Sequence, residues 1–219
     1  MIKPILFNTE MVRAILEGRK TVARRVVKPQ PVHESGFWKL GGAAWSDNLR
    51  EITPFPCHAL YNRAPYHPRD ILYVRETWTV WDGNYEYKAD VDDGYGPFCS
   101  NCTIDICTGY CNSVLKWHPS IHMPREAARI FLRVTDVRVE RLQEITNEQA
   151  QAEGVKGWMV AADRDWDKNP NYILAFRYAW DSTIKKADRA LYGWEADPWV
   201  WVIEFERVSR EEAAVGACQ

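Results

Sequence analysis

The sequence predicts a single α+β domain in which helices flank a small sheet, and three observations support this class. Residues 2–7 form a short apolar run, which predicts an opening strand. Residues 70–80 and 128–142 have the residue types and apolar alternation of strands. Residues 199–208 form a final strand pattern, and Pro170 opens a helical pattern before it. At 219 residues, with 46% hydrophobic and 26% charged residues, the chain is long enough for one well-buried core.

A helix and a basic corner follow the opening strand. Asn8 or Thr9 can cap this helix, and Gly18 stands where a helix ends in a left-handed residue. Its apolar positions have helical spacing: Met11, Val12, Ile15 and Leu16. The β-branched residues after Gly18 favour a strand. We therefore expect Lys20 and Thr21 at a corner between helix and strand.

Residues 18–25 carry four cationic side chains and one hydroxyl. Such a corner suits an anion or a nucleobase, and a solvated basic turn is the alternative interpretation. Arg24 and Arg25 alternate across the expected strand, so at most one should face a cleft. Net charge is only −2, while residues 1–30 hold seven Lys or Arg against two Glu. A local basic face on a neutral body favours a small nucleotide ligand over long duplex DNA.

The segment 29–68 is rich in proline and glycine, which predicts a long loop or loose hairpin. In the next strand Arg75 and Glu76 are adjacent, so they point to opposite faces of the sheet. One of them is expected to face a cleft, and an ion pair with a neighbouring strand is the alternative. Trp78 can stack on a base or fill the core. Asp82, Gly83 and Asn84 predict a hairpin turn.

Four cysteines within 13 residues predict a structural zinc site: Cys99, Cys102, Cys107 and Cys111. Unliganded thiols or an iron–sulfur centre are alternatives, although the usual cluster spacings fit less well. The sequence shows no signal peptide and no membrane-spanning run, so we expect a cytoplasmic protein with reduced or metal-bound thiols and no membrane partner. His118 and His122 can complete a metal site or contact a ligand, but a structural role is the more frequent one.

The alternation within residues 128–142 shifts near Thr135, which predicts a bulge or bend of the kind that closes small barrels. Thr146 and Gln149 then form a capping box at the head of a helix that ends at Gly154. Glu153 is its last residue, where the helix dipole disfavours an anion. We interpret Glu153 as a residue that either has no structural duty or meets a ligand.

Four motifs occur in a characteristic order along the chain. The first is Gly18-x-Lys20-Thr21-x-x-Arg24, and the second is Pro-x-Asp-x-Leu-x-Val-Arg-Glu at residues 68–76. The third is a Thr-capped helix that ends Ala-Glu-Gly, and the fourth is Trp-Val-Trp-Val-Ile-Glu-Phe at residues 199–205. In this order they resemble the ASCH domain. The resemblance implies a PUA-like fold, a small mixed β-barrel with flanking helices.

The resemblance covers residues 1–28, 66–80 and 126–208. It implies a single domain over residues 1–208 with two long insertions, a loop at 29–65 and the cysteine-containing segment 81–119. These insertions are similar to those of longer ASCH proteins encoded by phages and prophages. A flexible tail is expected at residues 209–219.

The resemblance also implies a cleft for RNA or a single nucleobase. In the best-understood small members the activity is amide hydrolysis of N4-acetylcytidine, carried by a Lys in the corner, a Thr three residues later and a Glu on the later helix. The matching residues here are Lys20, Ala23 and Glu153, so the chain departs from the family at the hydroxyl nucleophile. Thr21 or a water is then the substitute, or hydrolysis is lost, or Ala23 is an introduced change that makes the protein inactive. The expected substrate-binding residues are Arg24, Arg25, Arg75, Glu76 and Trp78.

Lys20 can act as a base only if burial or the neighbouring Arg24 and Arg25 lower its pKa. The Glu153 carboxylate can accept a hydrogen bond from the exocyclic amine of cytosine. Three hypotheses follow. The first is a nucleobase- or RNA-binding ASCH protein, with or without hydrolysis of a modified nucleoside. The second is a ribonuclease-like or purely RNA-binding module, and the third is a structural or interaction protein of a phage particle.

The cysteine spacing generates a direct test. We expect protein purified under reducing conditions to contain about one equivalent of zinc, because four thiolates complete a tetrahedral site. Elemental analysis measures the metal, and replacing Cys99 and Cys102 by serine should remove it. A metal content near zero would contradict the prediction.

Overall fold

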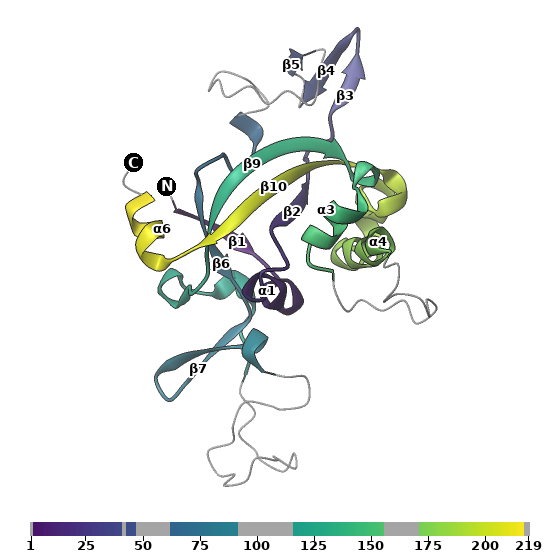
Figure 1. Ribbon diagram of the computed structural model, residues 1–219. Coiled ribbons are helices and arrows are strands. Elements are labelled where there is room, and N and C mark those ends of the chain that lie inside the picture. The colour runs from purple at the N-terminus through teal and green to yellow at the C-terminus, as the bar shows by residue number, and fades with distance from the viewer. Residues whose placement is uncertain (1, 41–42, 47–61, 92–115, 156–170, 217–219) are drawn as a thin grey trace.

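The computed structural model describes residues 2–40, 43–46, 62–91, 116–155 and 171–216. Its centre is a five-stranded mixed sheet in the order β1-β6-β9-β10-β2 (Figure 1). The strands are β1 (Ile2–Leu6), β2 (Val22–Val26), β6 (Ile71–Arg75), β9 (Phe131–Arg141) and β10 (Trp199–Val208). Strand β1 pairs with β6 in parallel, and the other three pairings are antiparallel. The predicted α+β class is confirmed.

Within the described residues this sheet does not close into a barrel, since β1 and β2 form its two edges. The long strands β9 and β10 curve across the molecule (Figure 1). The edges are joined by a side chain instead of a backbone ladder, because Arg25 of β2 donates to the Leu6 carbonyl of β1 at 2.9 Å. The barrel expected at the sequence level is therefore an open, curved sheet here.

The bend in the sheet arises at a bulge in the β9–β10 pair. Glu204 pairs with Asp136 and the next residue, Phe205, pairs with Val134, so Thr135 is the extra residue. A bulge bends its strand and increases the local twist. The shift in alternation near Thr135 predicted this bulge, and the structure confirms it.

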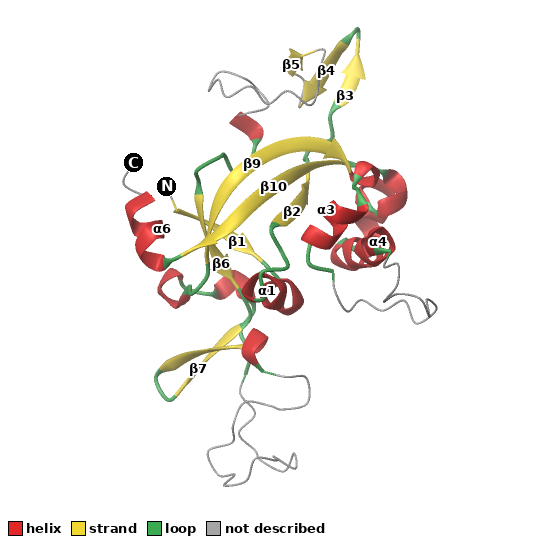
Figure 2. Cartoon of the chain, viewed as in Figure 1, coloured by secondary structure: helices red, strands yellow, loops and turns green. Residues whose placement is uncertain are grey.

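Figure 2 shows how the helices lie around the sheet. The α-helices are α1 (Thr9–Leu16), α3 (Asn147–Ala152), α4 (Tyr172–Thr183), α5 (Arg189–Tyr192) and α6 (Arg210–Gly216). Short 3-10 turns occupy Lys88–Asp90, Ser120–His122, Arg125–Ala127, Leu142–Glu144, Lys186–Asp188 and Trp194–Ala196. Asn8 caps α1 by accepting from the Met11 amide, and the capping box of Thr146 and Gln149 begins α3 as predicted.

Two further β-elements stand outside the main sheet. The segment predicted as a loop or loose hairpin contains a three-stranded sheet of β3 (Val32–Glu34), β4 (Phe37–Leu40) and β5 (Ala43–Ser46). The predicted hairpin is present as β7 (Trp78–Trp81) and β8 (Asn84–Tyr87), with Asp82 and Gly83 at positive φ in the turn. Proline and glycine therefore mark the ends of short strands in the first segment.

The predicted flexible tail is wrong over part of its length, because α6 occupies Arg210–Gly216. Ser209 and Glu212 cap its start reciprocally, through bonds from each backbone amide to the other side chain. Ala213 is buried against the core. The capping box and the buried Ala213 both stabilise this helix.

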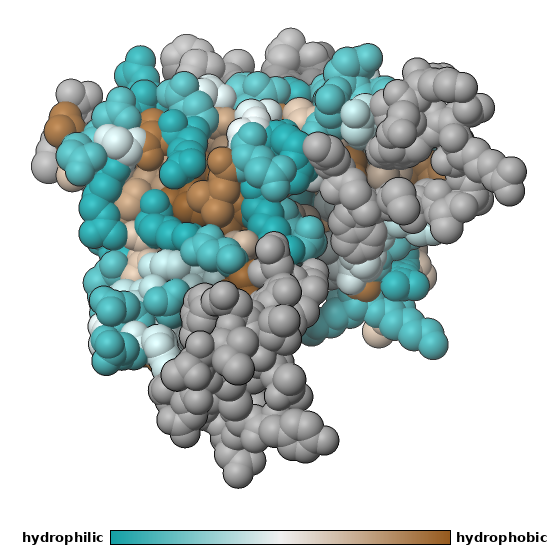
Figure 3. Space-filling view, turned by 60° about the horizontal axis from the view of Figure 1, so that its bottom comes forward, coloured by the Kyte–Doolittle hydropathy of each residue, from teal (hydrophilic) through white to brown (hydrophobic). Residues whose placement is uncertain are grey.

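The buried hydrophobic residues of the described part form three clusters, of which the one around Ala213 is the third. One cluster includes Ile5, Val12 and Ile203, and another packs Phe176 and Trp180 of α4 against the sheet. On the face shown in Figure 3, apolar surface lies between hydrophilic side chains. Among the described residues, no helix combines the length and apolarity needed to cross a membrane.

The end of α3 approaches α1 closely at Gly154. Its φ is +80°, and an added Cβ would lie 2.7 Å from the Ala14 Cβ and 2.9 Å from the Lys20 Cβ. We expect Gly154→Ala to lower the free energy of unfolding by about 2–4 kcal/mol, since a left-handed alanine and an overpacked contact both cost energy. Urea denaturation measures the change.

Gly18→Ala is the matched control, because Gly18 has a similar φ of +75° with nothing within 4 Å of an added Cβ. It should cost only about 1–2 kcal/mol, the conformational part alone. Equal costs for the two variants would show that the packing at Gly154 does not matter.

Candidate functional site

The helix-to-strand corner and the end of α3 are joined by backbone hydrogen bonds. Lys20 and Glu153 form an isolated antiparallel bridge, and the Thr21 amide donates to the Ala152 carbonyl at 2.9 Å. The Lys20 amide donates to Ala14 at 3.0 Å. This ladder brings together two side chains that lie 133 residues apart in the sequence.

The Lys20 ammonium is buried and fully hydrogen-bonded. Its Nζ donates to the Glu153 carboxylate (Oε2) at 2.6 Å, the Val22 carbonyl at 2.7 Å and the Glu153 carbonyl at 3.0 Å. Only 1% of the Lys20 side chain and 4% of the Glu153 side chain are exposed. An ammonium has three N–H donors, so these bonds use all of them.

Arg24 holds the other oxygen of the same carboxylate. Its guanidinium donates to Glu153 Oε1 at 3.2 Å, to Gln149 Oε1 at 3.0 Å and to Glu140 Oε2 at 3.5 Å. Its Nε is buried without a partner among the described residues. The Gln149 oxygen also accepts from the Thr146 amide, so the capping residue of α3 takes part in the site.

Burial lowers the pKa of Lys20, and this is the largest effect on it. The Glu153 carboxylate acts in the opposite direction, while the positive charges of Arg25 and Arg24 add to the lowering. The expectation that burial and neighbouring cations depress this pKa is confirmed in direction.

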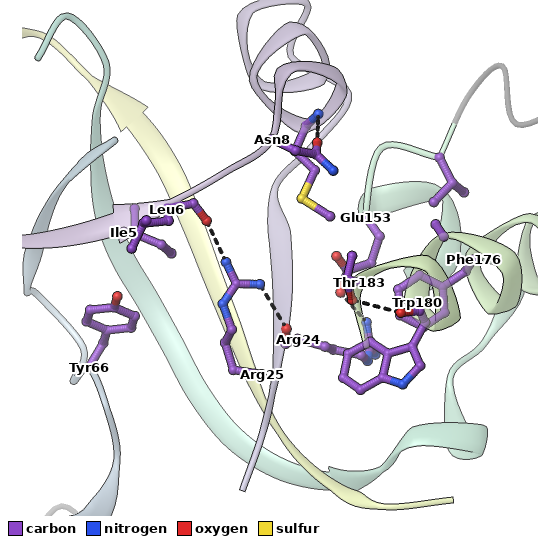
Figure 4. A pocket seen from close by; sticks show the side chains of 13 residues that line it. Ile5, Leu6, Asn8, Arg24, Arg25, Tyr66, Glu153, Phe176, Trp180 and Thr183 are labelled. Carbon is purple, nitrogen blue, oxygen red and sulfur yellow. Dashed lines mark hydrogen bonds and ion pairs between the residues drawn. The ribbon is translucent and has the colours of Figure 1, made fainter. Parts of the chain in front are cut away.

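A cavity of about 360 Å³ lies beside these ion pairs (Figure 4). Arg25 and Tyr66 lie on one side of it, and Glu153, Phe176 and Trp180 lie on the other (Figure 4). Its lining residues are Ile5, Leu6, Asn8, Met11, Arg24, Arg25, Tyr66, Glu153, Val155, Phe176, Ala179, Trp180 and Thr183. The wall is therefore mostly apolar, with charged groups on two sides.

Lys20 and Glu153 lie together as predicted, but only Glu153 lines the cavity, and its ion pairs give it the structural role that the sequence did not predict. The expectation that only one of Arg24 and Arg25 faces a cleft is wrong. Both residues line the cavity. Because β2 is an edge strand among the described strands, no further strand keeps the long Arg24 and Arg25 side chains from the cavity. Arg24 reaches towards α3 and Arg25 reaches towards Leu6.

Thr21 and Ala23 do not line the cavity. Thr21 is exposed in a separate hollow of about 340 Å³ formed with Gln151 and Tyr172. Ala23 is fully buried in the core and pairs with Ile203 of β10. Neither is in place to supply a hydroxyl to a ligand in the cavity.

Three predicted binding residues lie outside the cavity and have structural partners. Arg75 donates to the Met123 carbonyl at 3.0 Å. Glu76 is 1% exposed and pairs with Arg129 at 2.9 Å, and burial raises its pKa. Trp78 bridges His118 through the backbone, with the two rings 5.0 Å apart. For Glu76 the alternative of an ion pair is the one observed.

The predicted zinc ligands Cys99, Cys102, Cys107 and Cys111 lie outside the described residues, so the zinc site stays a prediction. Among the residues that are described, no group of three or more His, Cys, Asp or Glu side chains is arranged to hold a metal.

The sequence-based prediction missed the apolar walls of the cavity. Phe176 and Trp180 lie in the helical pattern that Pro170 opens, and their spacing fits a core position equally well. Tyr66 lies in the segment interpreted as a loop, and its hydroxyl donates to the Pro4 carbonyl at 2.7 Å. The sequence partly indicated that Gln149 lies near Arg24, because the capping box places Gln149 one turn before Glu153.

No protein-family model matches the chain, and comparisons with curated proteins and with solved structures likewise return no match. The interpretation of the site therefore rests on its own geometry. The buried Glu153 carboxylate is held by Lys20 and Arg24. Arg25 lies on the opposite side of the cavity, and the Phe176 and Trp180 rings of α4 line it.

Replacing Glu153 by glutamine tests the buried pair. We expect Glu153→Gln to cost about 3–5 kcal/mol of stability while Lys20 is charged, since an uncompensated ammonium remains buried. The loss of the carboxylate also lowers the pKa of Lys20 further below its ordinary value of 10.5. Between the lowered value and 10.5 the unfolded chain binds more protons, so the stability of the variant rises with pH there.

The difference in free energy of unfolding between the wild-type protein and the variant should therefore narrow between the Lys20 pKa of the variant and the less strongly lowered pKa of the wild-type protein, which urea denaturation at several pH values measures. Glu206→Gln is the control, because its pair with Arg133 at 3.0 Å is largely exposed. That substitution should cost about 0–1 kcal/mol. A cost for Glu153→Gln that does not change with pH would contradict the assignment.

Proposed function

We propose that this chain binds a single nucleobase, presented by a nucleoside or by single-stranded RNA, in the cavity between the β2 edge and α4. The observation that carries the proposal is the buried group of Lys20, Arg24 and Glu153 beside a cavity of about 360 Å³, whose wall includes Arg24 and Glu153. Cavities that hold small ligands are mostly apolar, have a few converging polar groups and enclose about 300–1,000 Å³.

Each wall suits one property of a base. A carboxylate oxygen has two lone pairs, and each oxygen of Glu153 accepts one side-chain hydrogen bond, from Lys20 or Arg24. Glu153 can accept a further N–H, such as the exocyclic amine of cytosine. Phe176 and Trp180 supply aromatic surface against which a base packs.

The resemblance to ASCH domains supports the proposal independently of the cavity. It assigns Lys20 and Glu153 to one site by motif alone, and the two side chains pair at 2.6 Å. The curved mixed sheet with its bulge and flanking helices is compatible with a PUA-like fold whose edges stay apart. We include membership of that fold in the proposal.

Hydrolysis of an N4-acylated cytidine is a second candidate, favoured by the lowered pKa of Lys20. Ala23 offers no hydroxyl, and the cavity hydroxyls of Tyr66 and Thr183 already donate to backbone carbonyls at 2.7 Å. In this candidate a water attacks the amide carbon and the neutral Lys20 amine takes the proton of that water. The Lys20 ammonium then returns this proton to N4 as the C–N bond breaks, and acetate and cytidine leave.

Ligand binding by defined variants tests the proposal. Cytidine and N4-acetylcytidine at millimolar concentration should raise the thermal midpoint of the wild-type protein, because a ligand of the native state stabilises it. We expect Glu153→Gln and Ala179→Leu to weaken this shift at least about tenfold in apparent affinity. The first removes a charge-assisted acceptor and the second fills the cavity from α4. Acetate release in the same samples measures hydrolysis.

Thr21→Ala is the matched control, since Thr21 lies in the separate hollow. Its binding should equal that of the wild-type protein. Ala179→Leu leaves the ion pairs in place, so it stays informative if Glu153→Gln does not fold. Equal binding by wild-type protein and Ala179→Leu, or no binding by the wild-type protein, would overturn the proposal. Binding without acetate release would eliminate the second candidate.

A further inference from the structure

We infer that the cavity takes its ligand as a phosphate ester, with Arg25 as the phosphate contact and the base on the side of Glu153. The inference deepens the proposed function and rests on it. It assigns the ligand class as a nucleotide or a nucleic-acid strand, in preference to a free nucleoside.

Arg25 is held in place by the edges of the sheet. Its guanidinium donates to the Leu6 carbonyl at 2.9 Å and to the Arg24 carbonyl at 3.1 Å (Figure 4). It also lies over the Phe7 ring, 5.4 Å from the ring centroid. Two bonds and a ring contact fix a planar group before any ligand arrives, which reduces the ordering cost of binding.

The charge of Arg25 is not balanced by an acidic partner. Lys20 and Arg24 share the Glu153 carboxylate, and Arg24 also pairs with Glu140. No carboxylate of the described residues lies at ion-pair distance from Arg25. Its two bonds to carbonyls neutralise no charge. A guanidinium has five N–H donors, so three remain for a ligand.

A phosphate fits those remaining donors. The planar guanidinium fork matches the oxygens of a phosphate and can bind two of them at once. Asn8 lines the same cavity, and because its Oδ1 accepts from the Met11 amide, its Nδ2 is a further donor. Figure 4 shows Arg25 across the cavity from Glu153. A base at Glu153 thus places its sugar and phosphate towards Arg25.

A free nucleoside would use only part of this arrangement, because it brings no anion to the uncompensated cation. Hydrogen bonds to charged groups contribute more than those between neutral groups. The phosphate should therefore add affinity that depends on Arg25 and weakens with salt.

The experiment compares four probes by calorimetry at low salt: cytidine, its 5′-monophosphate, its 3′-monophosphate and the dinucleoside monophosphate CpC. We expect a phosphate-bearing probe to bind the wild-type protein about ten- to a hundredfold more tightly than cytidine. If only a monophosphate binds more tightly than cytidine, the ligand is a free nucleotide. If CpC also binds more tightly than cytidine, the ligand is a nucleic-acid strand.

Arg25→Gln should reduce the affinity of the phosphate-bearing probes to that of cytidine and change cytidine binding less than about twofold. Arg25→Lys, which keeps the charge but loses the fork, should retain part of the gain. Arg133→Gln is the matched control, because it removes the same charge from an exposed pair outside the cavity and should leave all four affinities unchanged. Thermal midpoints of the variants check folding.

Equal binding of cytidine and its phosphates by the wild-type protein would overturn the inference and leave the proposed function standing. If Arg25→Gln weakened the binding of all four probes equally, the inference would also be overturned and the proposed function would stand, because Arg25 would then support the cavity without contacting a phosphate. Absence of binding by every probe would overturn both the inference and the proposed function.

Discussion

The ion pair between Lys20 and Glu153 is the constraint on which the site depends. Two charges this deeply buried lose most of their hydration, which is tolerable only when their hydrogen bonds are satisfied. Lys20 meets the condition through Glu153 and two carbonyls, and Glu153 meets it with the help of Arg24. The pair therefore requires the corner, the end of α3 and β2 to occupy one arrangement. Gly154 allows that arrangement because it has no side chain.

An open sheet explains why a cavity exists beside the pair. Hydrogen bonding between β1 and β2 would fill the gap with backbone, whereas the observed bridge from Arg25 to Leu6 leaves room on either side of the guanidinium. The bulge at Thr135 bends β9 and β10, which carry the two edges round towards each other. Helix α4 then covers the remaining side with Phe176 and Trp180.

The features that sequence reasoning predicted depend on local chemistry or on spacing. Capping by Thr146, the bulge at Thr135 and the turn at Gly83 each follow from a few adjacent residues. The features it missed depend on packing between distant segments. Glu76 pairs with Arg129, which lies 53 residues away, and no residue near Glu76 in the sequence predicts that pair. Tyr66 likewise reaches the cavity only because its segment packs against β1.

The hydrogen bonding of the site favours recognition over proton transfer. Lys20 spends all three N–H groups on fixed acceptors, so its loss of a proton must break the bond to Glu153 or to a carbonyl. Burial lowers its pKa, but the same carboxylate that a substrate would need resists the change. Glu153 keeps unused lone pairs, and Arg25 keeps unused donors on the opposite side. Glu153 and Arg25 can therefore still form hydrogen bonds to a ligand. Lys20, the group that would act as a base, has no N–H group left for one.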